Sequence, residues 1–330
     1  MNMTAETTLE RLLGFFAIED ENGVSNLDRV HTYQKILRRV ETTDKSKSVE
    51  AVEGTAEAEE IPNGIIMENG KIIGLGIHIY NEDVYPLKSF EINLRNCGLI
   101  GELDISDCTD MVFLDLYHNK ITAVRSKNMP SMRIFGVQDN RLETVDVSEM
   151  PSCQGIDAGM NRLKTIDVSH NPELVELYIN DNEFTGIDLS CNPKLKYFYC
   201  HNNHITELDT RANPLLRHLN ATGNPMKSIR SLAPQQEKKL PLELYAAEGG
   251  CIGLKFNPVY NAQWKETGEW QQSYYAYPDG GFRFDGWYEN GMKISEEETW
   301  TDEYGASRIL QARFIKTFFA YTAETTPCKE

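Results

Sequence analysis

The stretch from Cys200 to His204 carries a thiol and two imidazoles, the ligand types that zinc prefers in proteins. This stretch belongs to a pattern that recurs every 21 residues, and the pattern fixes the direction of each side chain. In that frame Cys200 points into the interior, His201 points outward from a strand, and His204 lies in a loop. Side chains that point apart do not converge on one ion, so the sequence predicts no metal site here.

Aspartates at the fifteenth place of the repeat form a second group that could attract a cation. The column consists of Asp146, Asp167, Asp188 and Asp209, and Asp104 joins it if the first repeat has one extra residue. Stacked carboxylates about 5 Å apart could recruit calcium, whereas each aspartate could instead accept a backbone hydrogen bond and hold its own turn. A serine often follows two residues later, and we therefore expect turn formation.

Catalytic motifs are lacking in the sequence. It contains no phosphate-binding glycine loop, no Gly-x-Ser-x-Gly elbow and no His-Glu-x-x-His pair. The sequence therefore predicts no catalytic residues, no metal and no cofactor, and it points to a binding protein in place of an enzyme.

The repeated units have one pattern of apolar and polar places. The units begin near Ser89, Met111, Met132, Cys153, Leu174, Leu195 and Leu216. Most have apolar residues at places one, four, six, eleven and fourteen, and asparagine at place nine, which is the leucine-rich repeat pattern. A unit of about 21 residues cannot bury its apolar face alone, so the units must stack. We predict a leucine-rich repeat solenoid with a parallel β-sheet on its concave face and a mostly irregular or extended convex side.

Two further columns are expected to shape each coil. The place-nine column is Asn119, Asn140, Asn161, Asn182, Asn203 and Asn224, with Cys97 in that place in the first repeat. An asparagine amide offers both donors and an acceptor, so this ladder can satisfy the backbone groups of a buried bend. The second column, at the end of the returning limb, is Pro130, Pro151, Pro172, Pro193 and Pro214. Proline suits an extended, non-helical limb.

Places three, five and seven of each repeat should point outward onto the concave face. The candidate partner-binding residues there are Phe113, Tyr117, Tyr178, Tyr197, Tyr199, His201, His218 and Asn220. Gly136, Gly155 and Gly159 leave room in the middle of the same face. Such aromatic residues are enriched at protein interfaces, although stacked rings also stabilise neighbouring strands by about 0.2–1 kcal/mol per pair.

The remaining segments differ from the repeats in composition. We predict a helical N-terminal segment (1–45, with helices at 7–17 and 25–41), an acidic linker (46–64), a β-hairpin that caps the solenoid (65–88), seven repeats (89–236), a small β-rich domain (240–317) and a C-terminal tail (318–330). An Asn-Gly pair at 69–70 indicates the first hairpin turn. The sequence around Gly249 and Gly250 predicts another hairpin.

The repeat block, with "IDVSHNP" and "IDLSCNP" in its returning limbs, resembles leucine-rich repeat proteins of Bacteroidetes and spirochaetes and, more distantly, the internalins. The segments "AAEGGCIGLKF", "AYPDGGFRFDGWYENGMKIS" and "ILQARF" resemble the divergent internalin B-repeat module. This resemblance implies a bacterial adhesin outside the cell or on its surface, although no signal peptide is visible in the chain. It also implies that Phe284, Trp287 and Tyr288 are core aromatics.

Composition narrows the class of partner. The formal net charge of −17 argues against nucleic acid, because nucleic-acid binders concentrate Lys and Arg. No run approaches the ~20 consecutive apolar residues of a membrane span. The seven cysteines are interpreted as free thiols.

We predict a non-enzymatic protein that binds a protein partner on the concave face. The alternatives are a glycan-binding adhesin that uses C-terminal aromatics such as Trp264 and Trp270, or a structural component of a secreted assembly or virion.

Overall fold

A computed structural model gives the architecture of the chain. It describes residues 11, 14–29, 65–68, 71–75, 94–232, 241–263, 265–302 and 308–317. Residues 14–16 and 26–29 are helical, within the two predicted N-terminal helices. The described residues do not include the rest of those helices, the acidic linker, the strand predicted for the first repeat or the C-terminal tail.

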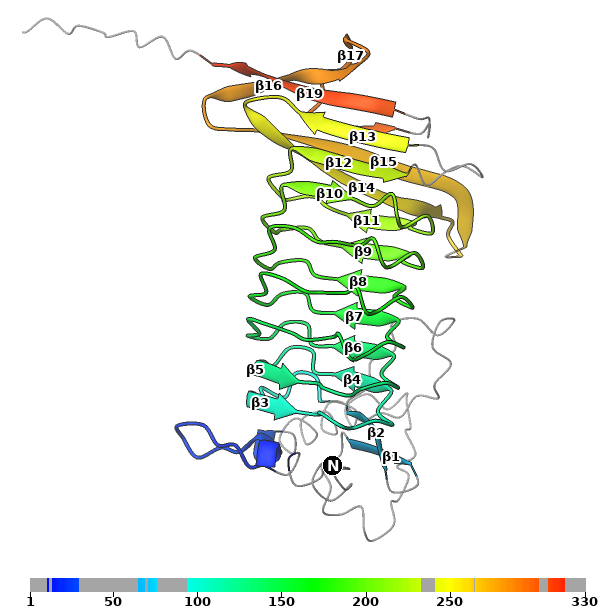
Figure 1. The fold of residues 1–330 in the computed structure, drawn as a ribbon. Helices are drawn as coiled ribbons and strands as arrows, with labels where there is room; N and C mark the ends of the chain where they lie inside the picture. Colours follow the sequence, from blue (N-terminus) through cyan, green and yellow to red (C-terminus); the bar gives the residue numbers. More distant parts are fainter. Residues whose placement is uncertain are drawn as a thin grey trace, which may run out of the picture.

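The centre of the molecule is a leucine-rich repeat solenoid, as the sequence predicts (Figure 1). Each turn contributes one short strand to a parallel sheet: β4 (Phe113–Asp115), β6 (Ile134–Gly136), β7 (Gly155–Asp157), β8 (Glu176–Tyr178), β9 (Tyr197–Tyr199) and β11 (His218–Asn220). Neighbouring strands pair in exact repeat register, with Phe113 opposite Ile134 and Ile134 opposite Gly155. Equivalent residues of successive repeats therefore lie side by side across the sheet.

An antiparallel pair lies at the N-terminal end of this sheet. Strands β1 (Ile65–Glu68) and β2 (Lys71–Leu75), on either side of the Asn-Gly pair in the sequence, form an antiparallel pair, which confirms the first predicted hairpin. Strand β2 also pairs in parallel with β4.

The returning limb is mostly extended and turn-like. Returning limbs of neighbouring repeats form short parallel strand pairs near the two ends of the solenoid. One pair is β3 (Ile100–Asp104) with β5 (Lys120–Arg125), and the other is β10 (Glu207–Asp209) with β12 (Ser228–Leu232). In the middle repeats this limb consists of bends and turns, which agrees with the proline column and with the predicted non-helical convex side.

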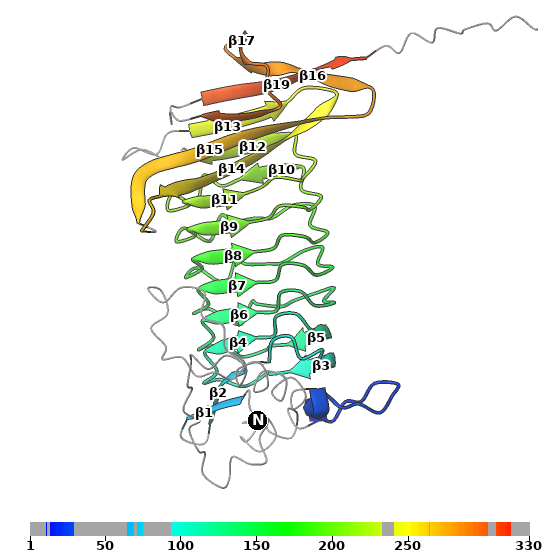
Figure 2. The same ribbon diagram turned by 180° about the vertical axis from the view of Figure 1, so that it is seen from behind.

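The C-terminal region continues both walls of the solenoid (Figure 2). Its strands are β13 (Pro241–Ala246), β14 (Gly250–Tyr260), β15 (Glu266–Pro278), β16 (Phe282–Glu289), β17 (Met292–Ser295), β18 (Thr299–Asp302) and β19 (Arg308–Lys316). Strands β14, β15 and β18 extend the concave sheet beyond β11, whereas β13, β19, β16 and β17 extend the sheet of β10 and β12.

The predicted hairpin around Gly249 and Gly250 is wrong. Strands β13 and β14 flank this turn but join different sheets, because β13 pairs with β12 and β19 while β14 pairs with β11 and β15. Both strands carry apolar residues that face the space between the two sheets. Because β14 lies in one sheet and β13 in the other, these residues cover that space from both sides.

One apolar core runs through the solenoid into the C-terminal region. It includes Leu177 and Phe198 of the repeats and Tyr274 and Trp287 of the C-terminal strands, all with at most 1% of their surface exposed. The C-terminal strands therefore cover the open end of the solenoid core, which would otherwise present apolar side chains to water.

Candidate functional site

Strand alternation gives the concave face a two-row grid of side chains. Leu177 of β8 and Ile179, which follows this strand, point inward and are fully buried, whereas Glu176 and Tyr178 point outward. Strand pairing aligns one row as Phe113, Ile134, Gly155, Glu176, Tyr197 and His218. The other row is Asp115, Gly136, Asp157, Tyr178, Tyr199 and Asn220.

The structure brings five of the predicted partner-binding residues together. They are Tyr178, Tyr197, Tyr199, His201 and His218, here called the aromatic cluster. The ring centroids of Tyr178 and Tyr199 are 5.1 Å apart, and those of Tyr197 and His218 are 4.4 Å apart and stacked. His201 meets Tyr199 edge-on at 6.4 Å. Four members are half-buried, whereas His218 is only 7% exposed.

His218 is covered by Tyr260, the last residue of β14. The Tyr260 ring stacks over the imidazole at 6.5 Å, and its hydroxyl lies 3.4 Å from His218 Nε2. The neighbouring Arg217 forms an ion pair with Glu266 at the start of β15. His218 therefore supports the aromatic cluster from one side and offers a partner little surface of its own.

The cluster is electrically neutral over the physiological pH range. Burial raises the pKa of the Tyr178, Tyr197 and Tyr199 hydroxyls, so these tyrosines stay protonated. Burial, with a smaller effect of Arg217, lowers the pKa of His218 to about 4. The pKa of His201 is also lowered, mainly by burial. The cluster thus presents aromatic bodies and neutral polar tips.

The other three predicted residues lie outside the aromatic cluster. Phe113 is buried on the concave face against Ile134, toward the N-terminal end of the sheet. Tyr117 is half-buried, and the Arg95 guanidinium lies 4.5 Å from its ring centroid. Asn220 lies on β11 opposite Tyr199, at the edge of the cluster, and accepts a hydrogen bond from the Thr222 hydroxyl at 2.8 Å.

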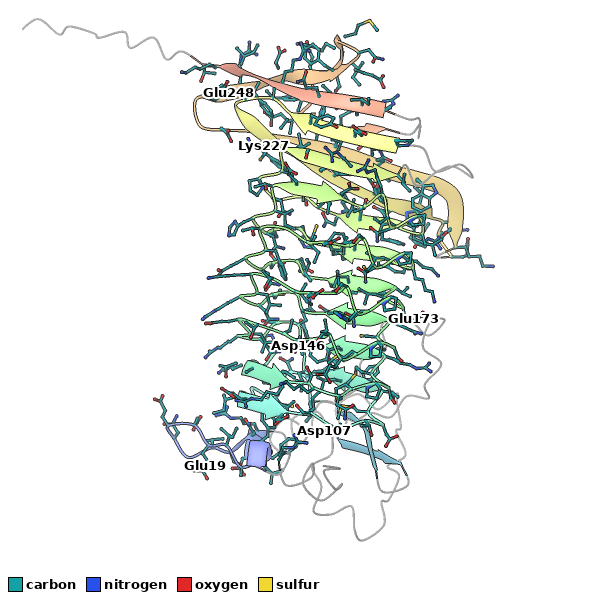
Figure 3. The ribbon with its side chains drawn as sticks, viewed as in Figure 1. Glu19, Asp107, Asp146, Glu173, Lys227 and Glu248 are labelled. Carbon is teal, nitrogen blue, oxygen red and sulfur yellow. The ribbon has the colours of Figure 1, made fainter. Side chains whose placement is uncertain are left out.

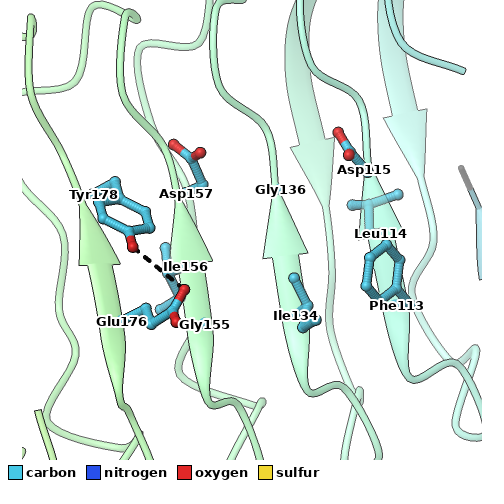
Figure 4. Close-up of a pocket in the computed structure, with 10 residues that line it drawn as sticks. All are labelled: Phe113, Leu114, Asp115, Ile134, Gly136, Gly155, Ile156, Asp157, Glu176 and Tyr178. Atoms are coloured by element: carbon cyan, nitrogen blue, oxygen red, sulfur yellow. Dashed lines mark hydrogen bonds between the residues drawn. The ribbon is translucent and has the colours of Figure 1, made fainter. Parts of the chain in front are cut away.

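A pocket lies between Phe113 and Tyr178 on the same face (Figure 4). Its empty volume is about 350 Å³, including space open to solvent. The lining residues come from four adjacent strands: Phe113, Leu114, Asp115, Ile134, Gly136, Gly155, Ile156, Asp157, Glu176 and Tyr178. The hollow exists because Gly136 and Gly155 occupy outward places where other repeats have larger side chains. The glycines thus provide the predicted room in the middle of the face.

Three carboxylates in this pocket were not among the predicted site residues. Asp115, Asp157 and Glu176 are 3%, 6% and 5% exposed, respectively. Burial raises the pKa of Asp115 and Glu176, although hydrogen bonds from the Tyr117 amide and the Tyr178 hydroxyl act in the opposite direction. The sequence signal was available, because acidic residues at outward places beside glycine are unusual on a face otherwise rich in aromatics.

The place-nine asparagines form a hydrogen-bonded ladder. In a typical rung, Asn182 Oδ1 accepts the Leu163 amide of the preceding repeat at 2.9 Å. Its Nδ2 donates to the carbonyl of Ala158 at 3.0 Å and to two carbonyls of its own bend. Asn119, Asn140, Asn161, Asn203 and Asn224 bond in the same way. This ladder links repeats and leaves no amide for a partner.

A second asparagine ladder was missed by the sequence reasoning. Asn171, Asn192 and Asn213 are almost fully buried, and each donates from Nδ2 to carbonyls of the preceding turn. The signal was visible, since each precedes a proline of the returning limb at the 21-residue period.

The aspartate column holds turns, as predicted. In each case an Asp oxygen accepts the backbone amide two residues later, for example Asp188 from Ser190 at 2.9 Å. The same bond occurs at Asp104, Asp146, Asp167 and Asp209. Figure 3 labels Asp146 of this column. Among the described residues, no group of three or more His, Cys, Asp or Glu side chains could hold a metal ion.

The Cys200–His204 segment divides as the repeat frame predicts. Cys200 is fully buried, His201 is half-buried on the concave face and His204 is exposed. The six described cysteines are free thiols, as interpreted from the sequence.

The C-terminal aromatics mainly fill the core. Phe284 and Trp287 are buried there, as the resemblance implies. The expectation that Tyr288 is also a core residue is wrong: it is half-buried, donates its hydroxyl to Asp285 and lies under the Arg313 guanidinium at 4.0 Å. Trp270 and Trp300 pack against the core, and Trp264 lies outside the described residues.

No helix within the described ranges is long and apolar enough to cross a membrane. No protein-family model matches the chain, and no curated protein matches it.

Similar solved structures are leucine-rich repeat proteins. A protein of Leptospira interrogans is 16% identical with a TM-score of 0.35, and the match covers 55% of each chain. An internalin of Listeria monocytogenes is 15% identical with a TM-score of 0.30, covering 40% of this chain and 51% of that one. The LRIM1/APL1C complex is 20% identical with a TM-score of 0.33, covering 42% and 29%. The chain thus spans between 29% and 55% of the length of these proteins.

Proposed function

We propose that this chain is a non-enzymatic binding protein that holds a protein partner on its concave face. The observation that carries the proposal is the aromatic cluster, in which half-buried tyrosine rings from adjacent strands contact one another. Tyrosine contributes a large apolar ring and a hydroxyl with few rotatable bonds, so it gives up little entropy on binding. Residues of this kind commonly dominate protein–protein affinity.

Two further features support a protein ligand. The side chains are fixed by strand register and by ring contacts, so the surface is formed before the partner arrives. The net charge of −17 also favours a partner with a basic surface, because complementary charge accelerates association.

The resemblance to internalin-like repeat proteins suggests bacterial adhesion at a cell surface as the setting for this binding. The glycan-binding alternative receives less support, because Trp287 is fully buried and Trp270 and Trp300 pack on the core. Sugar rings stack on exposed aromatic faces, which Trp287 does not offer and which Trp270 and Trp300 offer only in part.

The test compares Tyr178→Ala and Tyr199→Ala with wild type. A partner is first captured from the native source and purified, and its affinity is then measured by calorimetry. We expect each variant to lose roughly thirtyfold in affinity, equivalent to about 2 kcal/mol. Tyr275→Ala is the matched control, because Tyr275 is a half-buried tyrosine of β15 that stacks on Tyr277 away from the aromatic cluster.

Thermal melts of the same variants separate binding from stability. The proposal requires that both cluster variants melt within a few degrees of wild type. A lowered melting temperature with unchanged affinity would mean that the rings only join strands, and the proposal would then be abandoned.

A further inference from the structure

The pocket beside the aromatic cluster has a chemistry of its own. Strand register places Gly136 between Asp115 and Asp157 in one row of the concave face. It places Gly155 between Ile134 and Glu176 in the other row. Each glycine therefore opens a hollow whose sides include at least one carboxylate (Figure 4).

The carboxylates of this pocket are held largely out of water. Asp115 Oδ1 accepts the Tyr117 amide at 3.0 Å. Its buried Oδ2 has no hydrogen-bond partner, and the nearest guanidinium nitrogen, Nε of Arg95, is 3.6 Å away. Glu176 Oε2 accepts the Tyr178 hydroxyl at 3.4 Å, and no basic side chain in the described part of the chain forms an ion pair with Glu176. The Arg95 ion pair thus compensates Asp115 in part, whereas the buried charge of Glu176 has little compensation and is unfavourable unless a cation approaches.

The spacing of the acidic groups disfavours a bare metal ion. Asp115 and Asp157 lie on strands separated by β6, so their backbones are about 10 Å apart. Calcium takes about six to eight oxygen ligands, and among the described residues no group of three or more acidic, His or Cys side chains could hold a metal ion. A long organic cation can lie between them.

The remaining walls suit the hydrocarbon part of such a cation. Phe113 and Ile134 form a small apolar cluster on one side, and the Tyr178 ring closes the other side. Lysine and arginine bury their methylene stems along apolar surfaces while their charged ends meet carboxylates.

We propose that this pocket receives a lysine or arginine side chain of the protein bound on the concave face. The inference deepens the proposed function and rests on it. In this arrangement the aromatic cluster supplies contact area, and the pocket selects a basic residue at one position of the partner. Tyr178 belongs to both, because it lines the pocket and contacts Tyr199.

The test uses small probes that need no identified partner. Protein labelled with ¹³C at isoleucine methyl groups is titrated with Nα-acetyl-arginine methylamide and Nα-acetyl-lysine methylamide. The corresponding citrulline and norleucine derivatives are neutral controls of similar shape. We expect saturable shifts at Ile134 with the cationic probes, and binding at least about fivefold weaker with the neutral ones. Raising the salt concentration should weaken only the cationic probes.

Two matched variants locate the charge that is recognised. Glu176→Gln should weaken the cationic probes roughly tenfold, because it removes a buried carboxylate and preserves shape. Glu183→Gln makes the same charge change at an exposed residue outside the pocket and should have no effect. Circular dichroism and the methyl spectrum without probe confirm that both variants are folded.

Several results would overturn the inference. Equal binding of arginine and citrulline probes, or an unchanged affinity in Glu176→Gln, would remove the role of charge. Concentration-dependent shifts at Ile134 without probe would assign the pocket to a second copy of the chain. Shifts caused by calcium alone, at lower concentration than by either cation probe, would assign it to a metal.

The proposed function is tested separately with the purified partner. If Tyr199→Ala weakens the partner but the probes do not bind, the pocket inference fails and the concave-face proposal stands. If the probes bind as expected but neither Tyr199→Ala nor Glu176→Gln weakens the partner, the concave face is not its site and both proposals fail.

Discussion

Removing one rung of the place-nine ladder should destabilise the solenoid far more than removing one aspartate of the turn column. Asn182 is 8% exposed and makes four hydrogen bonds to backbone groups, with Leu163, Ala158, Ile179 and Asn180. In Asn182→Ala all four are lost. The buried Leu163 amide is left without an acceptor, because Asn182 Oδ1 is its partner.

The size of the effect follows from which groups are left unpaired. The carbonyls of Ala158, Ile179 and Asn180 each keep another donor. These donors are Asn161 Nδ2, Asn203 Nδ2 and the Met160 amide, respectively. The orphaned amide alone contributes about 1–3 kcal/mol, and the lost bonds add to it, so we expect about 3 kcal/mol of destabilisation. In Asp188→Ala, the exposed Ser190 amide loses one bond and is solvated by water, so we expect about 0.5 kcal/mol.

Urea denaturation followed by circular dichroism measures both free energies of unfolding. The pH dependence gives an independent check. The Ser190 backbone amide lowers the pKa of Asp188, so its contribution is complete above the unfolded pKa of about 3.9 and is lost as pH falls through the folded value. The deficit of Asp188→Ala should therefore shrink in acid, whereas that of Asn182→Ala should persist. If both variants lose the same unfolding free energy at neutral pH, the assignment of Asn182 to the buried interior and Asp188 to the surface is refuted.

Three other outcomes are expected. Met160→Asn should raise the unfolding free energy by about 0.5–1 kcal/mol in urea denaturation, because asparagine tolerates the left-handed backbone region better than methionine does. Met160 has a φ of 54°, and its equivalent in another repeat is Asn202, with a φ of 57°. Met160→Leu should give no gain. Glu176→Gln should raise the urea midpoint at pH 7, because burial raises the Glu176 pKa and ionisation of this side chain then opposes folding. The gain in midpoint should shrink as the pH falls toward the pKa of glutamate in the unfolded chain, about 4.3. A midpoint below that of wild type at pH 7 would contradict this expectation. Treatment with a chelator should leave the melting temperature unchanged, whereas a fall of several degrees would show that a bound metal contributes to stability.

The repeat period accounts for how much of the fold the sequence could predict. Once the 21-residue frame is known, the direction of each side chain follows from its place. Leu177 and Phe198 had to be inside, and Tyr178 and Tyr199 had to be outside. The same frame predicted the Asn182 bonds, since a buried bend needs an amide that both donates and accepts.

The C-terminal contribution could not be found from the same frame. Tyr260 is 42 residues from His218, and it reaches that imidazole because β14 pairs with β11 and extends the concave sheet. Nothing in the local sequence of either residue specifies that pairing. It depends on closing the open end of the solenoid core.

The room in the middle of the concave face was predicted from its glycines, but the acidic lining of the pocket was missed, because no motif defines it. Gly136 and Gly155 lie on neighbouring strands at different places of the repeat, so neither forms a column that stands out in an alignment of the units. Strand register turns these two glycines into one hollow with Asp157 and Glu176 beside it. A solenoid needs no buried carboxylate at an outward place, and a neutral isostere would avoid the desolvation that Glu176 undergoes. The stability gain expected for Glu176→Gln and its expected loss of cation binding are thus two consequences of the same charge, and observing both would separate a binding role from a structural one.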